Sequence, residues 1–380
     1  MKRVFAVIFS LVMALGLLSS CSDSGTDGLS HKDPESAGSE YTEKELIEAM
    51  GLGWNLGNTL DAPEGETSWG QPETTREMID ALKELGFNTI RIPTSWGQHN
   101  SGAPDYIIDE EWMDRVNTIV DWALDNDMFV ILNSHHDNDF YFPSGEHTEE
   151  SVNYITKIWT QIAERFKDYD QHLIFEPMNE PRLTGTQYEW NFDASSSECL
   201  EAESCIRQCN QACVDVVRAS GGKNADRYIL ASTYCGSPYS ALSDAYSLPE
   251  DPSNKLMLSI HAYTPYDLAM NKSLAINEFT DASKASIDDF MDKIYNKFVA
   301  NGVHAVITEC GCTNKGNDED RRAWGEYFVS KAKSCGMACV VWDNAHIDLG
   351  EECYGLFDRY NLKVYDESLA YYEGMLAGLK

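Results

Sequence analysis

The chain has 380 residues, of which 43% are hydrophobic and 24% are charged, an ordinary balance for a globular protein. Its formal net charge of −33 at pH 7 is far more acidic than usual. Such a charge excludes nucleic acids and anionic membrane surfaces as partners, because both are bound through a basic face.

The first 20 residues have the pattern of a targeting segment. Lys2 and Arg3 precede an apolar run that ends at Leu18 and is too short for an ordinary membrane-spanning helix. Residues 18–21, Leu-Ser-Ser-Cys, resemble a bacterial lipobox, which predicts cleavage before Cys21 and lipidation of its thiol. The alternative is a plain secretory signal peptide followed by a chance cysteine.

Residues 22–40 are rich in serine, glycine and acidic residues and cannot bury a core. We therefore expect residues 1–20 to be a lipoprotein-type signal peptide, residues 21–40 a flexible tether with a lipidated Cys21, and residues 41–380 the folded domain. The protein is expected to be secreted and held at the bacterial cell envelope or outer surface, touching a membrane only through its lipid anchor.

From residue 41 onward, short apolar runs alternate with helical patterns. The expected strands are Gly51–Leu56, Thr89–Ile92, Phe129–Asn133, Leu173–Glu176, Tyr228–Ser232, Leu256–His261, His304–Glu309 and Ala338–Trp342. The expected helices are Thr75–Leu85, Glu110–Asn126, Glu149–Phe166, Glu201–Ala219, Lys284–Asn301, Glu319–Ser334 and Tyr365–Leu376. This alternation predicts an α/β fold, a (β/α)₈ TIM barrel with a single catalytic domain. The link between strands five and six, residues 236–254, resembles a loop more than a helix.

Ten cysteines lie beyond Cys21, and four of them cluster in residues 199–213. A zinc site is possible there, but no histidine lies nearby in the sequence. In a secreted protein this many cysteines favours disulfide bonds, whose pairing cannot be deduced from the sequence.

Polar or aromatic residues follow seven of the eight expected strands. In chain order they are Asn55 and Asn58, Arg91, His135 and His136, Asn179 and Glu180, His261 and Tyr263, Glu309, and Trp342 with Asn344. Any one of them has a structural explanation, such as a surface ion pair or a core histidine. Because the strands of a barrel end at one face, the joint pattern instead predicts an active site.

Two glutamates on well-separated strands, Glu180 and Glu309, suit the hydrolysis of glycosidic bonds. One carboxyl group must protonate the leaving oxygen while the other, ionised, attacks or activates water. Arg91 is expected to keep Glu309 ionised, and Tyr263 to donate a hydrogen bond to it. Asn179 is expected to bind a sugar hydroxyl.

Aromatic residues supply flat faces for sugar rings. Trp342 is the main stacking candidate, with Trp69, Trp96 and Trp190 on loops as further ones. Glu176 precedes a proline and is expected to lie deeper in the barrel as a paired structural charge.

A catalytic metal is not expected. Residues 135–137 are His-His-Asp, but neighbours on an extended strand point to opposite sides, so both histidines cannot easily bind one ion. The chain also lacks a Gly-x-Ser-x-Gly nucleophile elbow and the glycine fingerprints of nucleotide sites. No cofactor is therefore predicted.

These motifs together resemble glycoside hydrolase family 5, a large cellulase family of clan A. The resemblance runs from about residue 41 to the C-terminus, and residues 51–62 resemble the opening of subfamily 4 endoglucanases. It implies a retaining mechanism with Glu180 as acid/base and Glu309 as nucleophile. It also implies that the remaining active-site residues are Arg91, His135, Asn179, His261, Tyr263 and Trp342. Cys310 and Ala345 depart from the family pattern, which has a bulky apolar residue and a glycine there.

The expected activity is that of a retaining endo-β-1,4-glucanase that acts as a monomer on β-glucan polysaccharides. The same chemistry on xyloglucan, mixed-linkage β-glucan, xylan or mannan is one alternative. A non-catalytic glycan-binding surface lipoprotein is another, although such proteins usually lose one of the two carboxylates.

Overall fold

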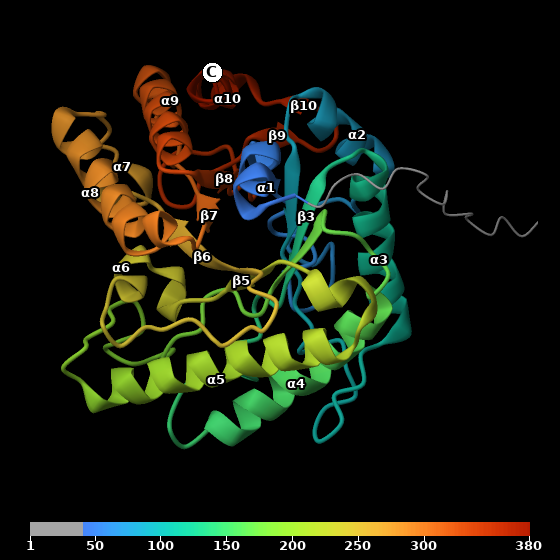
Figure 1. Ribbon diagram of the computed structural model, residues 1–380. Coiled ribbons are helices and arrows are strands. Elements are labelled where there is room, and N and C mark those ends of the chain that lie inside the picture. Colours follow the sequence, from blue (N-terminus) through green and yellow to red (C-terminus); the bar gives the residue numbers. More distant parts are fainter. Residues whose placement is uncertain (1–40) are drawn as a thin grey trace, which may run out of the picture. The chain divides into compact units, whose positions relative to one another are not determined.

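Eight parallel strands close into a barrel, with β1 hydrogen-bonded to β8, in the computed structural model, which describes residues 41–380 (Figure 1). The strands are β1 Leu52–Asn55, β2 Thr89–Ile92, β3 Phe129–Asn133, β4 Leu173–Glu176, β5 Ile229–Ala231, β6 Leu256–Ala262, β7 Ala305–Cys310 and β8 Met337–Val341. The predicted barrel is confirmed, and the bounds of β2, β3 and β4 agree residue for residue with the expected ones. Residues 41–380 belong to one compact unit.

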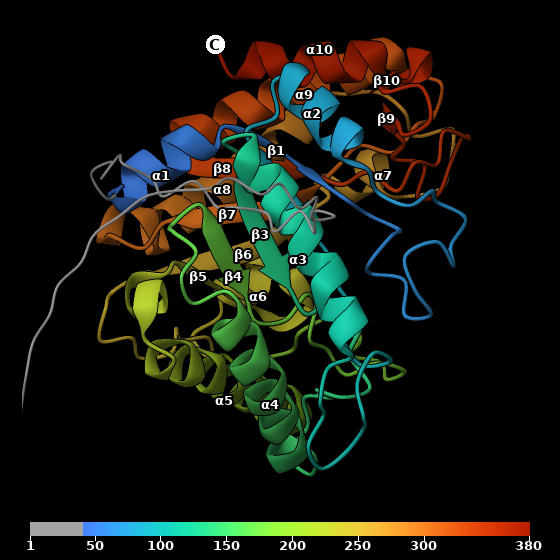
Figure 2. The same ribbon diagram turned by 90° about the vertical axis from the view of Figure 1, so that its right-hand side faces the viewer.

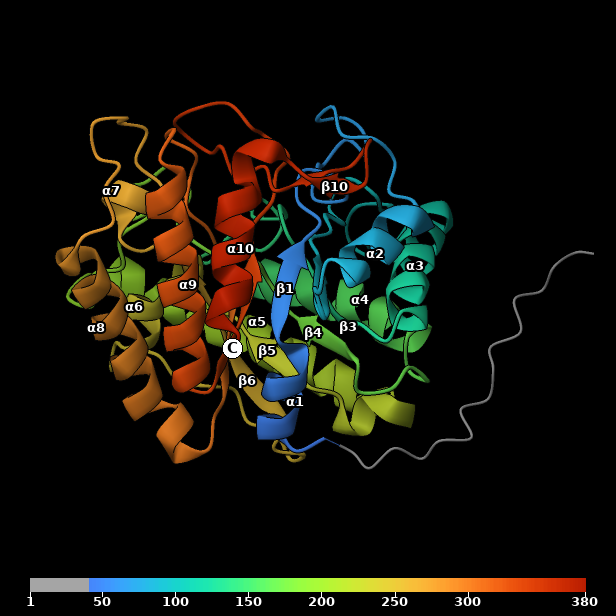
Figure 3. The same cartoon turned by 90° about the horizontal axis from the view of Figure 1, so that it is seen from above.

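Helices surround the barrel when it is seen from above (Figure 3). They are α1 Glu43–Met50, α2 Arg76–Glu84, α3 Glu110–Asp125, α4 Thr148–Arg165, α5 Ser197–Ala219, α6 Pro238–Ala241, α7 Tyr266–Ala269, α8 Asp281–Lys297, α9 Asp318–Ser334 and α10 Leu369–Gly378. The β5–β6 connection holds only short helical turns, as expected. A small hairpin of β9 Phe357–Asp358 and β10 Lys363–Val364 follows the barrel and was not expected.

Every residue of the eight barrel strands is buried, because helices cover the outside and side chains fill the inside. The inner residues near the strand starts, such as Phe129 and Met257, form one apolar cluster with Leu46, Ile47 and Met50 of α1. Helix α1 therefore closes the barrel at the amino ends of the strands. The loops that follow the strands lie at the opposite face (Figure 2).

The prediction of disulfide bonds is wrong: all ten cysteines among residues 41–380 are buried free thiols. Cys205, Cys209 and Cys213 are four residues apart on α5 and so share one face of that helix. Cys205 interacts with Cys209 and with Thr148 and Ser151 of α4. Helices α4 and α5 lie side by side in Figures 1 and 2. The thiols act as small apolar residues where these two helices pack together.

Glu203 of α5 is buried, and neither of its carboxylate oxygens has a hydrogen-bond partner within the described residues. Burial raises its pKa from 4.5 to about 8, although Arg207 and Lys297 oppose the shift. The folded state therefore binds a proton more tightly than the unfolded state. The stability this provides is complete below pH 4.5 and is lost as the pH rises toward 8.

Replacing Glu203 by glutamine is expected to stabilise the protein at pH 8 by on the order of a few kcal/mol, because the amide never ionises. At pH 4.5 the two proteins should have similar melting temperatures. Thermal unfolding followed by circular dichroism at several pH values measures the difference. A difference that did not grow with pH would contradict the assignment.

The predicted signal peptide and tether lie in residues 1–40, outside the described residues. Among residues 41–380 no helix combines the length and the apolar character needed to cross a membrane.

Candidate active site

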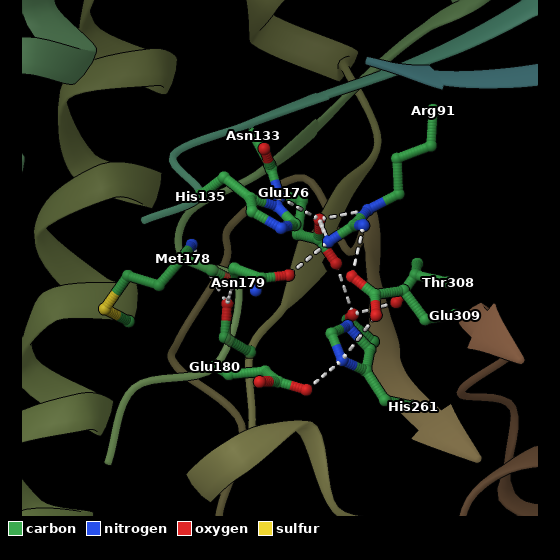
Figure 4. A network of polar contacts seen from close by, with 12 residues as sticks. Arg91, Asn133, His135, Glu176, Met178, Asn179, Glu180, His261, Thr308 and Glu309 are labelled. Atoms are coloured by element: carbon green, nitrogen blue, oxygen red, sulfur yellow. Dashed lines mark hydrogen bonds and ion pairs between the residues drawn. The ribbon is translucent and has the colours of Figure 1, made fainter. Parts of the chain in front are cut away.

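The polar residues predicted at the strand ends come together at the carboxyl face of the barrel. Figure 4 shows Glu180 just beyond β4 and Glu309 in β7 with their side chains converging, and His261 of β6 between them. The register of β6 against β7 shifts between Ile260 and His261. Such a bulge re-aims the side chains that follow it, here His261 and Glu309.

Arg91 of β2 is fully buried and connects four acceptors. Its Nε donates to Glu176 Oε2 at 2.7 Å, and its two terminal nitrogens donate to Glu309 Oε1 at 2.8 Å, Asn55 Oδ1 at 2.9 Å and Asn179 Oδ1 at 2.7 Å. The predicted contact of Arg91 with Glu309 and the predicted burial of Glu176 as a paired charge are confirmed.

Glu309 accepts a second hydrogen bond from the Tyr263 hydroxyl, which lies 2.9 Å from Oε2, as predicted. One oxygen of Glu309 is thus held by Arg91 and the other by Tyr263. This arrangement holds the carboxylate in one fixed orientation.

Glu180 and His261 form a tightly coupled pair, with His261 Nδ1 2.7 Å from Glu180 Oε1 and 3.6 Å from Glu309 Oε2. Burial alone would raise the pKa of Glu180, but the hydrogen bond and charge of His261 hold it below its usual value. Burial alone would lower the pKa of His261, but Glu309 and Glu180 raise it. In the substrate-free protein the proton of this pair therefore lies mainly on His261.

Aromatic rings border the site. Trp342 lies parallel to His135, with ring centroids 5.8 Å apart, and Trp69 lies 5.5 Å from His136. Trp190 is 57% exposed and carries the Arg182 guanidinium over its ring at 4.1 Å. Trp69 and Trp190 are exposed stacking candidates, although Arg182 covers one face of Trp190.

The prediction for Trp96 is wrong: it is fully buried and donates its indole N–H to the Asn133 carbonyl. Two predicted substrate-binding residues also do not reach the cleft. Asn55 is fully buried, with its amide bonded to Arg91 and to the Thr308 carbonyl. Asn344 is turned into its own loop, where it donates to the Glu352 carbonyl. Both support neighbouring residues instead.

Other site residues were not predicted. Asn133 ends β3 and contacts both His135 and Glu176, while Ser259 donates to Glu176 from β6. Asn133 could have been found from its place at a strand end. Ser259 gave no such signal, because serine inside an apolar strand is common.

The geometric argument against a metal at the histidine pair is also wrong. His135 and His136 follow the end of β3 rather than lying on it, and their rings are 4.5 Å apart. Potential ligand atoms of Asp61, His135 and His136 all lie within 4.8 Å of one another. A second such group is Glu180, His261 and Glu309, in which Arg91 pairs with Glu309 and His261 contacts Glu180.

The two departures from the family pattern have local explanations. Cys310 is buried, and its thiol contacts Cys339 and the Val340 carbonyl, away from the cleft. Ala345 has a φ of +58°, the left-handed region that favours glycine, so the expectation of glycine there is sound and alanine is strained.

Comparisons with known proteins agree with this geometry. The family model described as Cellulase (glycosyl hydrolase family 5) matches residues 55–347. Endoglucanase A of Ruminococcus albus is 40% identical over 329 residues, covering 84% of this chain and 88% of that protein. Cellulase/esterase CelE of Acetivibrio thermocellus is 38% identical over 96% of this chain, but the chain spans only 46% of that protein.

Among solved structures, a GH5-4 broad specificity endoglucanase from Ruminococcus champanellensis with bound cellotriose superposes with a TM-score of 0.83 at 41% identity. The match covers 88% of this chain and 98% of that one. Since the family model and these relatives span most of the barrel, the chain belongs to glycoside hydrolase family 5 and is a glycoside hydrolase of the endoglucanase type.

Proposed function

We propose that the protein hydrolyses internal β-1,4-glucosidic bonds with retention of configuration, with Glu309 as nucleophile and Glu180 as acid/base. The observation that carries the proposal is the spacing of the two carboxylates, which approach each other to within 4.8 Å. Retaining enzymes hold the two carboxyl groups about 5–5.5 Å apart, whereas inverting enzymes need about 6.5–9.5 Å to admit a water.

In the first step Glu309 attacks the anomeric carbon, and the glycosidic oxygen leaves with a proton delivered by Glu180. The coupled His261 holds that proton in the resting site and passes it through the 2.7 Å contact to Glu180. In the second step Glu180 takes a proton from water, and the resulting hydroxide displaces the sugar from Glu309. Arg91 and Tyr263 orient Glu309 for both displacements.

The stereochemistry of the first product tests this mechanism. Proton NMR during hydrolysis of a soluble cello-oligosaccharide should show the β-anomer of the new reducing end first, followed by mutarotation to the equilibrium mixture. Early appearance of the α-anomer would show inversion and overturn the assignment of Glu309 as nucleophile.

A β-1,4-glucan is the substrate class that we propose. The relative from Ruminococcus champanellensis was solved with cellotriose, which supports binding of β-1,4-linked glucose, and its description as broad specificity keeps xyloglucan and mixed-linkage β-glucan as further substrates. Reducing-sugar assays on soluble glucans, xyloglucan, xylan and mannan separate these. The presence of both carboxylates, in contact with Arg91 and His261, speaks against a glycan-binding protein without turnover.

We further propose that the enzyme is a secreted monomer anchored to the cell envelope through a lipid on Cys21, on the basis of the lipobox-like sequence before that residue. Changing Cys21 to serine is expected to move the protein from the membrane fraction, which detergent dissolves, to the soluble fraction. The reason is that serine lacks the thiol to which the lipid would be attached. Fractionation with immunoblotting measures this. Continued membrane association of the variant would refute the anchor.

A further inference from the structure

Asn133, the last residue of β3, is fully buried directly behind the cleft. Figure 4 shows its amide between His135 on one side and Glu176 on the other. Its Nδ2 lies 3.1 Å from His135 Nδ1 and 3.0 Å from Glu176 Oε2. The side chain therefore connects a residue that faces the cleft with the carboxylate that holds Arg91.

Two independent contacts determine which way the Asn133 amide points. The backbone N–H of Thr94 donates to Oδ1 at 3.1 Å, so the oxygen must be on that side. The Glu176 carboxylate, which also accepts from Arg91 at 2.7 Å, can only accept, so Nδ2 must be on its side. A flipped amide would place oxygen against oxygen at Glu176 and N–H against N–H at Thr94.

This orientation determines the tautomer of His135. Because Asn133 Nδ2 is a donor, His135 Nδ1 must accept and carries no proton. Burial, helped by nearby His136 and Arg91, lowers the pKa of His135 well below its ordinary value, so the ring is neutral at working pH. A neutral imidazole without a proton on Nδ1 carries it on Nε2.

We propose that Asn133 is a positioning residue that locks His135 as the Nε2–H tautomer, so that His135 can only donate to a substrate hydroxyl and cannot bind a metal ion. The donation to a substrate hydroxyl rests on the proposed function, because it requires His135 to border the sugar beside Trp342. The tautomer and the inability to bind a metal ion concern the free protein and do not depend on the substrate.

The lock explains how the site can hold Asp61, His135 and His136 close together without becoming a metal centre. A metal ligand must offer a lone pair, and His135 has none to offer: Nδ1 accepts from Asn133 and Nε2 carries the proton. Binding an ion through Nε2 would move the proton to Nδ1, where it would face the N–H of Asn133. The same lock therefore favours sugar binding and disfavours metal binding.

Long-range ¹⁵N–¹H NMR of the histidine rings tests the lock in the wild-type protein without substrate. His135, assigned by comparison with His135→Gln, is expected to show an unprotonated Nδ1 and a protonated Nε2. A wild-type His135 protonated on Nδ1 would overturn the proposal, irrespective of whether the enzyme cleaves glucans. The tautomer itself is read from the wild-type spectrum, and the variant serves only to assign the signal.

Zn²⁺ inhibition tests the consequence. In Asn133→Ala the proton of His135 can move to Nδ1 without facing another N–H, and Nε2 can then bind Zn²⁺. Zn²⁺ should therefore inhibit this variant about ten- to hundredfold more strongly than wild type, which corresponds to relief of one clash between buried donors. His136→Ala added to Asn133→Ala should remove the extra sensitivity. Equal Zn²⁺ sensitivity in wild type and Asn133→Ala would refute the lock.

Ser259→Ala is the matched control, because it removes a different donor to Glu176 and leaves His135 untouched. It should keep the wild-type tautomer and Zn²⁺ response even where its kcat/KM falls. If Ser259→Ala became as Zn²⁺-sensitive as Asn133→Ala, the effect would come from loosening of Glu176 and the proposal would fail.

Discussion

Replacing Glu309 by alanine is expected to lower kcat on soluble cellulose derivatives by at least about 10⁴-fold, because the covalent intermediate can no longer form. Glu180→Ala should cost about 10²–10⁴-fold, the usual contribution of a general acid or base. Initial rates of reducing-sugar release measure both. Melting temperatures close to that of wild type show that the losses are chemical.

Added azide distinguishes the roles of the two carboxylates. In Glu309→Ala the small anion can enter on the emptied side and attack the substrate directly, giving an α-glycosyl azide. In Glu180→Ala, given an activated aryl cellobioside that needs no acid, azide attacks the glycosyl-enzyme from the water side and gives a β-glycosyl azide. The same anomer from both variants would contradict the assigned roles.

Replacing Arg91 by methionine is expected to destabilise the fold by roughly 3–5 kcal/mol, because Glu176 and Glu309 are then left as buried charges without their cation. Chemical denaturation measures the loss. The value of kcat/KM on soluble cellulose derivatives should also fall, because Glu309 loses the 2.8 Å hydrogen bond from Arg91 that fixes one of its oxygens.

The double variant Arg91→Met/Glu176→Gln is the control for this prediction. Neutralising Glu176 removes one of the two buried charges, so part of the stability should return. The lowered kcat/KM, which reflects the lost contact of Arg91 with Glu309, should stay. Full stability in Arg91→Met alone would show that the buried pair contributes little and would contradict the prediction.

The strands were predictable because each is a short apolar run bounded by residues that do not favour a β-strand. For β4, Pro177 follows the last strand residue, and for β3 a polar segment begins at Ser134. The strand ends then placed Glu180, His261 and Glu309 at one face by the geometry of the barrel alone. Helix α1 was missed because its eight residues are too short for a periodic pattern, and its apolar side is satisfied only by strands far along the chain.

The errors share a cause, which is that residue type does not reveal what a side chain faces. Asn55 has an amide that could bind a sugar hydroxyl, but this amide already forms hydrogen bonds with Arg91 and with backbone carbonyls. The cysteines have the chemistry of disulfides, but three of them share one face of α5. The contacts of His135 and Asn133 depend on where β3 ends and the loop turns, which a pattern cannot fix to one residue.

The closure of the barrel by α1 bears on how an anchored enzyme would meet its substrate. Tyr41, just before α1, packs on Phe129 at the start of β3 and accepts a hydrogen bond from Tyr228 just before β5. The described chain thus begins at the end of the barrel opposite Glu180 and Glu309. Whatever precedes Tyr41 therefore joins the domain on the face away from the two glutamates, and the face at which a long polymer would bind is left free of that attachment.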